Sequence, residues 1–425
     1  MRNPIVIEDT NKNIRILKNQ TFQTIILSKN SSQNRNKITI ERTSKSVCLG
    51  KVNQINQIKM LRKIMQILLS LIIILGLTTY LFLQQKVFGK NPTGTRLTRI
   101  EKSPNYRDGF FQNQSVTEVM SEGASTLGTM CKFLNKTKNV EPQQIMPSIK
   151  TDLINLADDK PTIVWFGHSS YLIKSKGFTI LMDPVFSGSA SPVSFFGKSF
   201  AGSDVYNVDD MPKIDMLILS HDHYDHLDYE TITKLIPKVK KFYTALGVGE
   251  HLEHWGVKPE NIIEFDWWEN QQISPDISIT ATPARHFSGR GFTRAKSLWA
   301  SYVLKIHGYN LFLGGDSGYD KHFKIIGDKF GPFDIAFLEN GQYNMDWHAI
   351  HTLPEETAQA AKDLNTKVLM PVHWGKFVLA FHDWNEPISD LKKIMDKQNI
   401  KLTTPLIGEP VVLDGVYPDK IWWNF

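Results

Sequence analysis

The stretch Ser220-His221-Asp222-His223-Tyr224-Asp225-His226-Leu227-Asp228 places three histidines and two aspartates within six residues. It directly follows the apolar run Met216–Leu219, which predicts a buried strand that ends at the polar cluster. His221 and His223 point to the same side because side chains alternate along a strand, and the next turn brings Asp225-His226 to a second ion. Imidazole and carboxylate groups suit zinc or, less selectively, iron or manganese. The stretch therefore predicts a metal site; the alternative is a polar loop that holds several histidines by chance.

Three further candidate ligands, His286, Asp316 and His373, each come directly after an apolar run that has the character of a strand. Loops at strand ends can deliver such side chains to one edge of a sheet. Strands that end in His or Asp alternate here with helical segments such as Pro354–Asp363, which opens with a proline and two glutamates. This arrangement predicts a layered α/β fold.

The charge of the chain is unevenly distributed. Its 425 residues carry a formal charge of +6, but residues 1–63 hold 13 Lys and Arg against 3 Asp and Glu, and the rest holds 36 against 40. The remaining chain therefore lacks the basic character of a nucleic-acid binder, and we expect no nucleic-acid partner. The two cysteines, Cys48 and Cys131, lie far from the histidine cluster in the sequence and support neither a disulfide framework nor a cysteine zinc site.

A membrane anchor is predicted for residues 60–86, with the uncharged, largely apolar run Ile64–Leu83 as the membrane-spanning part. Twenty residues of helix measure about 30 Å, the thickness of one bilayer core. A buried helix of a globular domain is the alternative. The basic flank Lys59, Arg62 and Lys63 favours a cytoplasmic N-terminus and a single-pass protein whose folded C-terminal domain lies on the extracytoplasmic, periplasmic side, although basic residues after the run weaken this orientation.

The other domain boundaries follow from composition. Residues 1–59 are rich in Asn, Gln, Lys, Ser and Thr and are predicted to be disordered. Because Met60 begins a short basic stretch before the apolar run, residues 1–59 are also candidates for an over-extended reading frame. Residues 87–160 have the polar, irregular character of a stalk and wrapping segment, and residues 161–425 are predicted to form the folded domain that holds the candidate metal ligands.

The ordered ligand set resembles the five motifs of the metallo-β-lactamase superfamily, an αββα sandwich with a dinuclear metal site along one edge. Within it, the chain is most similar to the branch of N-acylphosphatidylethanolamine-hydrolysing phospholipase D and its bacterial, membrane-anchored relatives. The motifs that carry this likeness are Gly167-His168, Asp183-Pro184-Val185-Phe186-Ser187, Ser220–Asp228, Gly315-Asp316-Ser317-Gly318-Tyr319, His351-Thr352-Leu353-Pro354-Glu355-Glu356 and Pro371-Val372-His373-Trp374-Gly375. Phospholipases of the branch have Asn where this chain has Asp222, and Arg285-His286-Phe287 also differs in detail.

The resemblance implies two Zn²⁺ ions, or other divalent metals, that activate a bridging hydroxide without a side-chain nucleophile. Asp316 would bridge the ions and Asp225 would be both ligand and catalytic residue. Asp183 would orient a ligand histidine from outside the ligand set. His168 is expected at the sheet edge or in such a supporting position, not as a ligand. The implied metal ligands are His221, His223 and His286 for one ion and Asp225, His226 and His373 for the other.

The same resemblance places Tyr224 and His351 at substrate-contacting, catalytic positions, where a phenol or imidazole could bind the phosphate or protonate a leaving oxygen. Either residue could equally be structural. Arg290, in the loop after His286, could meet an anionic headgroup. The aromatic segment Ser194–Phe200 suits a lid or a lipid-facing rim, and packing of its rings beneath the loop is the alternative.

We expect a zinc-dependent phosphodiesterase of phospholipase D type that acts on N-acylphosphatidylethanolamine-like phospholipids, with membrane lipid as both anchor environment and substrate. One alternative is a lactone or other ester hydrolase, since the same dinuclear site also attacks carbonyl groups in this superfamily. A non-catalytic, membrane-tethered binding protein is a further alternative that would require a degenerate ligand set. The oligomeric state stays open.

Overall fold

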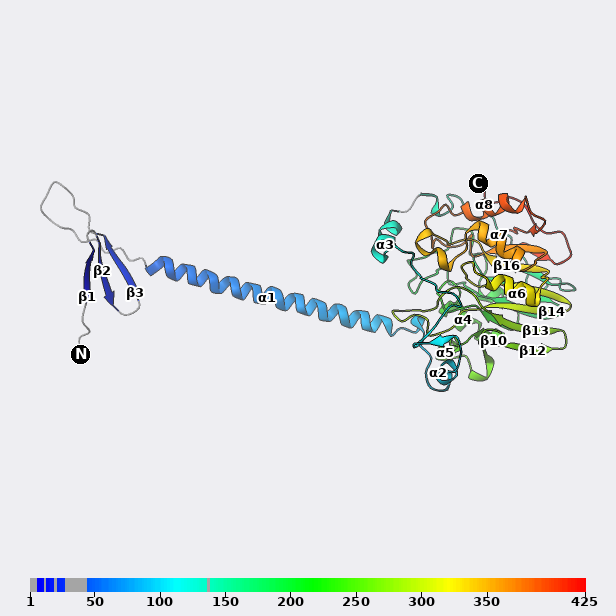
Figure 1. The fold of residues 1–425 in the computed structure, drawn as a ribbon, viewed down its shortest axis with the longest axis horizontal. Helices are drawn as coiled ribbons and strands as arrows, with labels where there is room; N and C mark the ends of the chain where they lie inside the picture. Colours follow the sequence, from blue (N-terminus) through cyan, green and yellow to red (C-terminus); the bar gives the residue numbers. More distant parts are fainter. Residues whose placement is uncertain (1–5, 11–12, 19–20, 27–43, 136–137) are drawn as a thin grey trace. The chain divides into compact units, whose positions relative to one another are not determined.

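The computed structural model describes residues 6–10, 13–18, 21–26, 44–135 and 138–425, which fall into two compact units, 1–83 and 84–425 (Figure 1). The first unit contains an antiparallel sheet of β1 (Val6–Thr10), β2 (Asn13–Lys18) and β3 (Thr21–Ile26), followed by α1 (Ser44–Leu83). The disorder that the sequence predicts for residues 1–59 stays a prediction. Short runs rich in Ile, Val and Thr favour strands despite the polar average composition. Residues 27–43, which belong to the segment predicted to be disordered, lie outside the described residues.

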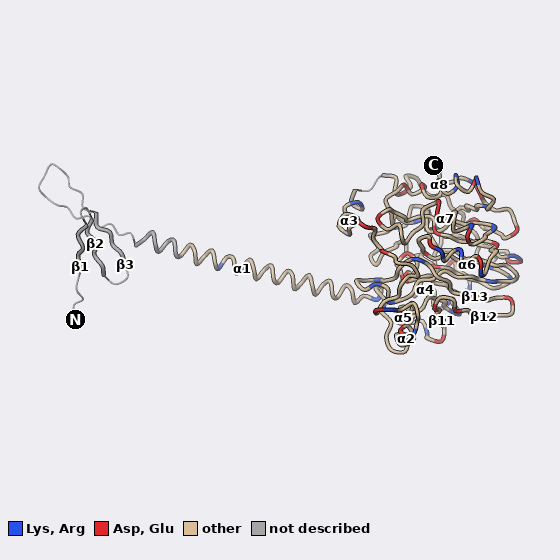
Figure 2. The backbone as a smooth tube through the Cα atoms, in the orientation of Figure 1, with Lys and Arg blue, Asp and Glu red and all other residues tan. Residues whose placement is uncertain are grey.

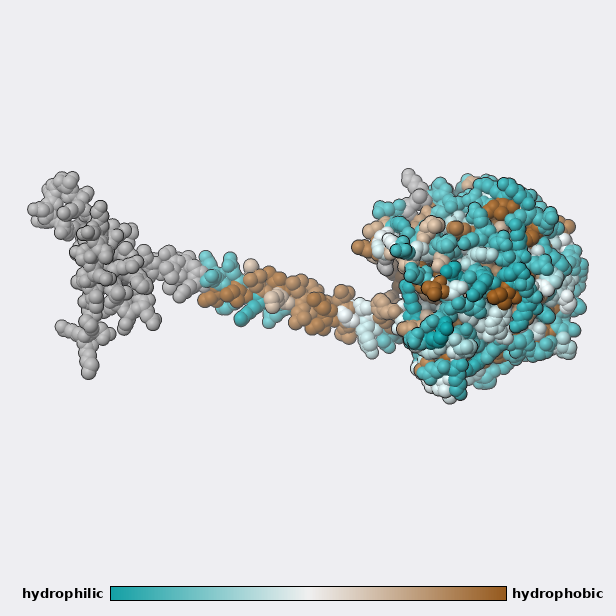
Figure 3. All heavy atoms as spheres, in the orientation of Figure 1, coloured by the Kyte–Doolittle hydropathy of each residue, from teal (hydrophilic) through white to brown (hydrophobic). Residues whose placement is uncertain are grey.

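Helix α1 contains most of the residues that the sequence predicts to form a membrane anchor. Within the described residues, Val52–Leu83 is a 32-residue helical segment long and apolar enough to cross a membrane, and none of it is buried. Figure 3 shows apolar side chains along most of this segment, whereas the second unit is largely hydrophilic on the face shown, with scattered apolar patches. In Figure 2 the acidic and basic residues of that second unit are interspersed. The structure thus contains a candidate membrane-spanning helix.

The second unit is built on two seven-stranded sheets, ordered β11-β10-β9-β8-β7-β6-β19 and β12-β13-β14-β15-β16-β17-β18. The first comprises β6 (Thr162–Trp165), β7 (Tyr171–Ser175), β8 (Phe178–Met182), β9 (Ile214–Leu219), β10 (Val239–Ala245), β11 (Ile262–Phe265) and β19 (Pro410–Val412). The second comprises β12 (Asn270–Ser274), β13 (Ile277–Thr282), β14 (Ser301–Ile306), β15 (Tyr309–Leu313), β16 (Ile335–Glu339), β17 (Val368–Val372) and β18 (Lys401–Leu402).

The main core lies between these sheets. The ring of Tyr171 on β7 stacks on Phe337 of β16, with centroids 4.3 Å apart, so the two sheets pack face to face. Tyr302 on β14 donates a hydrogen bond to the Leu219 carbonyl at the end of β9 (2.8 Å). A second core, which includes Phe312, joins the outer face of the second sheet to α6 (His322–Phe330), α7 (Pro354–Asp363) and α8 (Glu386–Met395). The layered sandwich expected from the sequence is therefore confirmed.

The remaining helices and a small hairpin lie around the sandwich. They are α2 (Gly94–Ile100), α3 (Thr126–Leu134), α4 (Tyr229–Leu235), α5 (Gly249–His254) and the hairpin of β4 (Tyr106–Arg107) and β5 (Phe110–Phe111). Among the described residues, short 3-10 helices span Lys86–Phe88, Lys138–Val140, Val208–Asp210, Ile236–Lys238, Pro259–Asn261 and Met345–Ile350. Arg96 on α2 forms ion pairs with Glu250 and Glu264 (both 2.7 Å), so the predicted wrapping segment is held against the sandwich.

Parallel strand pairing explains where the functional residues gather. Strands β8 and β9 are parallel, as are β15, β16 and β17, and strands buried on both faces form continuous apolar runs such as Met216–Leu219. Parallel strands place their carboxyl ends at one edge, where ligands bind in open α/β sheets. Polar residues at or just after these ends are therefore brought together. They are Asp183 after β8, His221 after β9, Asp316 after β15, Glu339 at the end of β16 and His373 after β17.

Candidate metal centre

The first group of candidate ligands consists of His221, His223, His286 and Asp316, whose ligand atoms all lie within 4.8 Å of one another. His221 Nε2 is 2.9 Å from His223 Nδ1, and His286 Nε2 is 3.2 Å from the same nitrogen. Asp316 Oδ2 lies 3.9 Å from His221 Nε2 and 3.7 Å from His286 Nε2. These four residues come from three separate loops, and the structure brings them to one point, as the ligand set implied by the sequence requires.

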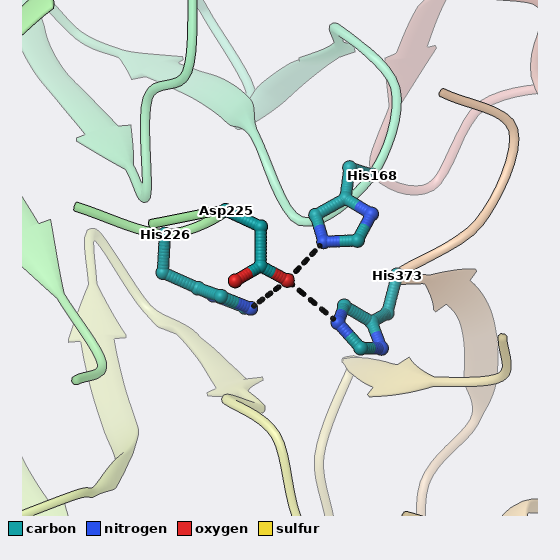
Figure 4. A group of neighbouring side chains, drawn as sticks. All are labelled: His168, Asp225, His226 and His373. Carbon is teal, nitrogen blue, oxygen red and sulfur yellow. Dashed lines mark hydrogen bonds and ion pairs between the residues drawn. The ribbon is translucent and has the colours of Figure 1, made fainter. Parts of the chain in front are cut away.

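The second group converges on Asp225 (Figure 4). Its Oδ2 lies 2.9 Å from His168 Nε2, 3.6 Å from His226 Nε2 and 3.4 Å from His373 Nε2. We expected His168 in a supporting position, and its direct contact with Asp225 fits that position. The same contact also places its ring nitrogen among the candidate ligand atoms of this group. Because His168 is distant from Asp225 in the sequence, no sequence pattern predicts that the two side chains are in contact.

Asp316 lies against both groups. Its Oδ1 is 3.1 Å from His226 Nε2 and its Oδ2 is 3.2 Å from His373 Nε2, in addition to its contacts in the first group. This carboxylate therefore occupies the position expected of a bridging ligand.

The donor set fits divalent metal ions. His226 Nε2 and Asp316 Oδ1 are buried and, although 3.1 Å apart, they lack the alignment of a hydrogen bond and have no other hydrogen-bond partner. Buried polar atoms of this kind are rare unless another species completes them. Burial lowers the pKa of His168 to about 3 and the pKa values of His221 and His286 well below the usual range. These three imidazoles are therefore neutral, which is the form that binds metal.

The pKa values of His226 and His373 shift in the opposite direction. Burial lowers the pKa of each, but the carboxylates of Asp316 and Asp225 outweigh it, and the pKa of His226 rises to about 10. The two acids in turn have pKa values well below the usual range, because their histidine partners outweigh burial. The two carboxylates therefore stay ionised where the two groups meet, each paired with protonated histidine, and a cation held there would take the place of those protons.

A layer of hydrogen bonds behind the ligands fixes their orientation. Asp183 is fully buried and accepts from Ser220 N (2.8 Å), Ser220 Oγ (2.6 Å) and His226 Nδ1 (2.8 Å). His286 Nδ1 donates to the Ile350 carbonyl at 3.0 Å. Such contacts leave Nε2 of each imidazole directed at the site. Asp183 therefore stands in the orienting position expected of it.

Backbone strain accompanies this arrangement. Asp183, His168 and His373 adopt left-handed conformations with φ of 40°, 53° and 68°. A non-glycine residue in this region costs of the order of 1–3 kcal/mol and persists where the surroundings impose it, often at functional sites. All three residues lie at the convergence of the ligand groups, which indicates a preformed site.

Glu339 was absent from the residues singled out in the sequence. Its buried carboxylate lies 2.6 Å from His351 Nδ1 and 3.2 Å from His373 Nδ1, and it also accepts from Ser317 N at 2.9 Å. The His351 and His373 rings stack with centroids 5.2 Å apart. Glu339 thus holds a candidate ligand and a candidate proton donor together. Its position at the end of an apolar strand, like that of Asp316, was the available signal.

Arg290 does not lie where the sequence placed it. Its side chain is 4% exposed and donates to the Asp222 carbonyl (2.8 Å), the Leu227 carbonyl (2.6 Å) and the Val87 carbonyl (2.8 Å). The guanidinium is therefore committed to holding the ligand loop, and the expectation that it binds a headgroup is corrected.

Tyr224 is also directed away from the site. Its hydroxyl donates to the Arg290 carbonyl, its ring lies under the Arg290 guanidinium (4.1 Å), and burial raises its pKa to about 12. A phenol held in this way does not reach a bound phosphate, so the substrate-contacting role expected of Tyr224 is not supported. Asp222, expected outside the ligand set, accepts from Gly289 N (2.6 Å) and Ser297 Oγ (2.7 Å) and so fixes the loop after His286.

A cavity of about 350 Å³ opens onto the ligands. Its wall includes His351 and Arg294, the latter with its guanidinium 5.1 Å from the Phe287 ring centre. The rest of the wall is mostly apolar and comes from the wrapping segment, α3 and the loops after β13, β16 and β17; it includes Val119, Met120, Phe133, Phe287, Trp347, Ile350 and Leu379. Arg294, four residues beyond Arg290, is therefore the cation that faces the site.

Comparison with known proteins identifies the superfamily of this chain. A family model described as the beta-lactamase superfamily domain matches residues 179–374. A metal-dependent hydrolase of Pyrobaculum islandicum is 28% identical over 225 residues, which cover 52% of this chain and 87% of that protein. The chain belongs to the metallo-β-lactamase superfamily and is a metal-dependent hydrolase.

Two further relatives indicate which branch of the superfamily the chain resembles. An uncharacterized protein of Mycobacterium tuberculosis is 35% identical over 329 residues, or 76% of this chain and 88% of that protein. N-acyl-phosphatidylethanolamine-hydrolyzing phospholipase D 1 of Caenorhabditis elegans is 30% identical over 255 residues, or 56% of this chain and 71% of that protein. The expected likeness to the phospholipase D-like branch is confirmed.

Proposed function

We propose that the protein is a zinc-dependent phosphodiesterase of phospholipase D type that hydrolyses N-acylphosphatidylethanolamine-like phospholipids. The observation that carries the proposal is the composition of the cavity. Candidate His and Asp metal ligands line it, Arg294 is part of its wall, and most of the remaining wall is apolar. Such a wall suits acyl chains, and a guanidinium suits a phosphate diester. The likeness to a phospholipase D supports the same substrate class.

The His and Asp groups would hold two divalent ions, for which Zn²⁺ is the proposed identity because imidazole nitrogen and carboxylate oxygen are its usual ligands. When bound, the ions would supply Lewis acidity and lower the pKa of a water. The reaction would add water to phosphorus and break the bond from phosphorus to the headgroup oxygen, releasing phosphatidic acid and the N-acylethanolamine.

His351 is the proposed proton donor to the leaving oxygen. It lines the cavity, and its Nδ1 is engaged by Glu339 (2.6 Å), which leaves Nε2 as the nitrogen for exchange with substrate. Arg294 would bind the phosphate through charge-assisted hydrogen bonds. The remaining wall excludes water from the ester and orients the chains.

We also propose that α1 anchors the protein as a single-pass membrane helix with the hydrolase unit on the extracytoplasmic side. The length and apolar character of Val52–Leu83 support insertion, and the basic residues before it support the orientation. Protease protection in intact and permeabilised cells tests the orientation.

The substrate is tested by incubating the full chain in detergent or proteoliposomes with N-acylphosphatidylethanolamine, simpler phospholipids, an aryl phosphodiester and a lactone panel. We expect phosphatidic acid from the phospholipids, with turnover abolished by chelation and restored by Zn²⁺. Turnover of lactones without any phosphodiester cleavage would instead establish the ester-hydrolase alternative and defeat the proposal.

A further inference from the structure

Two phenylalanines are held in solvent on a shaped loop, Ser189–Ser199, called here the aromatic loop. Phe195 is 79% exposed and Phe196 is 56% exposed. The loop is closed by hydrogen bonds from Ala190 N to the Gly197 carbonyl (2.8 Å) and from Ser189 Oγ to the Phe196 carbonyl (2.6 Å). Internal bonds of this kind fix an outward presentation of the rings, which water alone would disfavour. An exposed apolar loop with its own scaffold indicates an interaction site.

The aromatic loop lies beside the residues that follow α1. A cavity of about 430 Å³ is lined by Gln85, Lys86 and Val87, by residues 187, 189, 191, 192 and 194 of or next to the aromatic loop, and by residues 228–230. Helix α1 ends at Leu83. Because one residue extends the chain by at most about 3.6 Å, Gln85 lies within roughly 7 Å of the end of the apolar helix by covalent connection alone.

A third exposed phenylalanine, Phe292, lies on a loop that is bonded to the same residues. Phe292 is 86% exposed in the loop 291–294, called here the Phe292 loop. At the base of this loop, Arg290 donates from Nε (3.1 Å) and Nη2 (2.8 Å) to the Val87 carbonyl. The segment 84–90 is therefore flanked by two loops that expose aromatic rings.

These three segments are also uniformly basic. Lys86, Lys198 and Arg294 are exposed, and residues 84–90, 189–199 and 291–294 contain no Asp or Glu. Exposed aromatic rings next to unpaired cations are the combination that binds the headgroup layer of an anionic bilayer, where rings enter the acyl boundary and cations meet lipid phosphates.

We propose that segment 84–90, the aromatic loop and the Phe292 loop form a membrane-contact surface that rests on the bilayer in which α1 is inserted. The proposal rests on the proposed insertion of α1 and not on the identity of the substrate. Arg294 belongs to the Phe292 loop and also lines the cavity over the metal ligands. A phospholipid can therefore pass from the bilayer to the site along one loop without crossing bulk water.

Depth measurements on the full chain test this surface. Cys48→Ser and Cys131→Ser remove the native thiols. In that background, Phe195→Cys or Phe292→Cys introduces one thiol, to which an environment-sensitive fluorophore is attached. The labelled protein is placed in phosphatidylethanolamine–phosphatidylglycerol vesicles with or without spin-labelled lipid as the quencher. At both positions we expect the fluorophore emission to be blue-shifted and most of that emission to be quenched by the spin-labelled lipid. Ser70→Cys within α1 is the positive control.

Val416→Cys is the matched negative control, because Val416 is 94% exposed at the opposite end of the sandwich. Its neighbour Asp414 bonds to Tyr309 (2.9 Å) at the start of β15, whereas Asp316 follows the end of that strand, about 17 Å away. Quenching at 195 and 292 but not at 416 supports the surface. Quenching at 70 alone overturns it and would indicate that the rings serve a protein partner. No quenching at 70 overturns the anchor on which the surface depends.

Because the labels report depth without turnover, this result stands even if the substrate proposal fails. A second measurement addresses lipid delivery. The pair Phe195→Ser and Phe196→Ser is expected to lower turnover of vesicle phospholipid while leaving turnover of a water-soluble aryl phosphodiester unchanged. Equal loss on both substrates would overturn the delivery role.

Discussion

The metal centre and the cavity wall above it are built in contrasting ways. The candidate ligands follow buried strands and are fixed from behind by residues such as Asp183 and Glu339. The wall comes from the wrapping segment, α3 and long loops, and is mostly apolar. Strand ends therefore determine the chemistry, whereas loops select the substrate. Changes at the two regions should have effects of different size and kind.

The largest effect is expected at the shared ligand. Asp316→Ala removes a carboxylate that lies 3.1–3.9 Å from histidines of both groups, so both ions should be lost. Activity should fall well beyond the roughly 10- to 100-fold typical of a supporting contact. Asp225→Ala touches one group and should cost one ion. Metal analysis of the purified variants checks this, and retention of two ions in Asp316→Ala would contradict the bridging role.

A smaller loss is expected behind the ligands. Glu339→Gln keeps the shape but weakens the hold on His351 and His373, so activity should fall about 10- to 100-fold with at least one ion retained. Asp334→Asn, at a half-buried partner of Lys367 outside the site, is the matched acid-to-amide control. Wild-type kinetics in Glu339→Gln would show that the carboxylate does not support the site.

The cavity wall should discriminate between substrates. Arg294→Ala removes an exposed cation and with it a hydrogen bond to the charged phosphate. This loss corresponds to an about tenfold weaker interaction, which should appear chiefly as a higher KM for phosphodiesters. A neutral lactone substrate should be almost unaffected. Lys305→Ala on β14 is a control for charge alone. An equal loss on charged and neutral substrates would assign Arg294 a structural role.

The smallest effect is expected at Tyr224. Tyr224→Phe deletes a hydroxyl that bonds only to the Arg290 carbonyl, so the free energy of unfolding should fall by about 1 kcal/mol with unchanged kinetics. Denaturant unfolding and steady-state rates measure the two quantities. A large drop in kcat would return Tyr224 to the reaction.

Apolar runs that end in His or Asp predicted a layered α/β fold, and the family resemblance implied both the sandwich, which the structure confirms, and the seven candidate ligands. It did not distinguish Arg290 from Arg294, since both lie in one loop whose turn decides which guanidinium is buried. His168 lies 57 residues from Asp225, and no local pattern reports their 2.9 Å contact. Glu339 was missed because a single acid at a strand end resembles an ordinary boundary residue.

Titration of the metal-free protein is the most direct test of the central claim that two ions in one site drive phospholipid hydrolysis. Zn²⁺ would be added stepwise to the chelator-treated full chain in N-acylphosphatidylethanolamine vesicles, with bound metal and released phosphatidic acid measured together. We predict no turnover without metal and full turnover at two ions per chain. Full turnover without metal, or two bound ions with no hydrolysis of any phosphodiester, would contradict the claim.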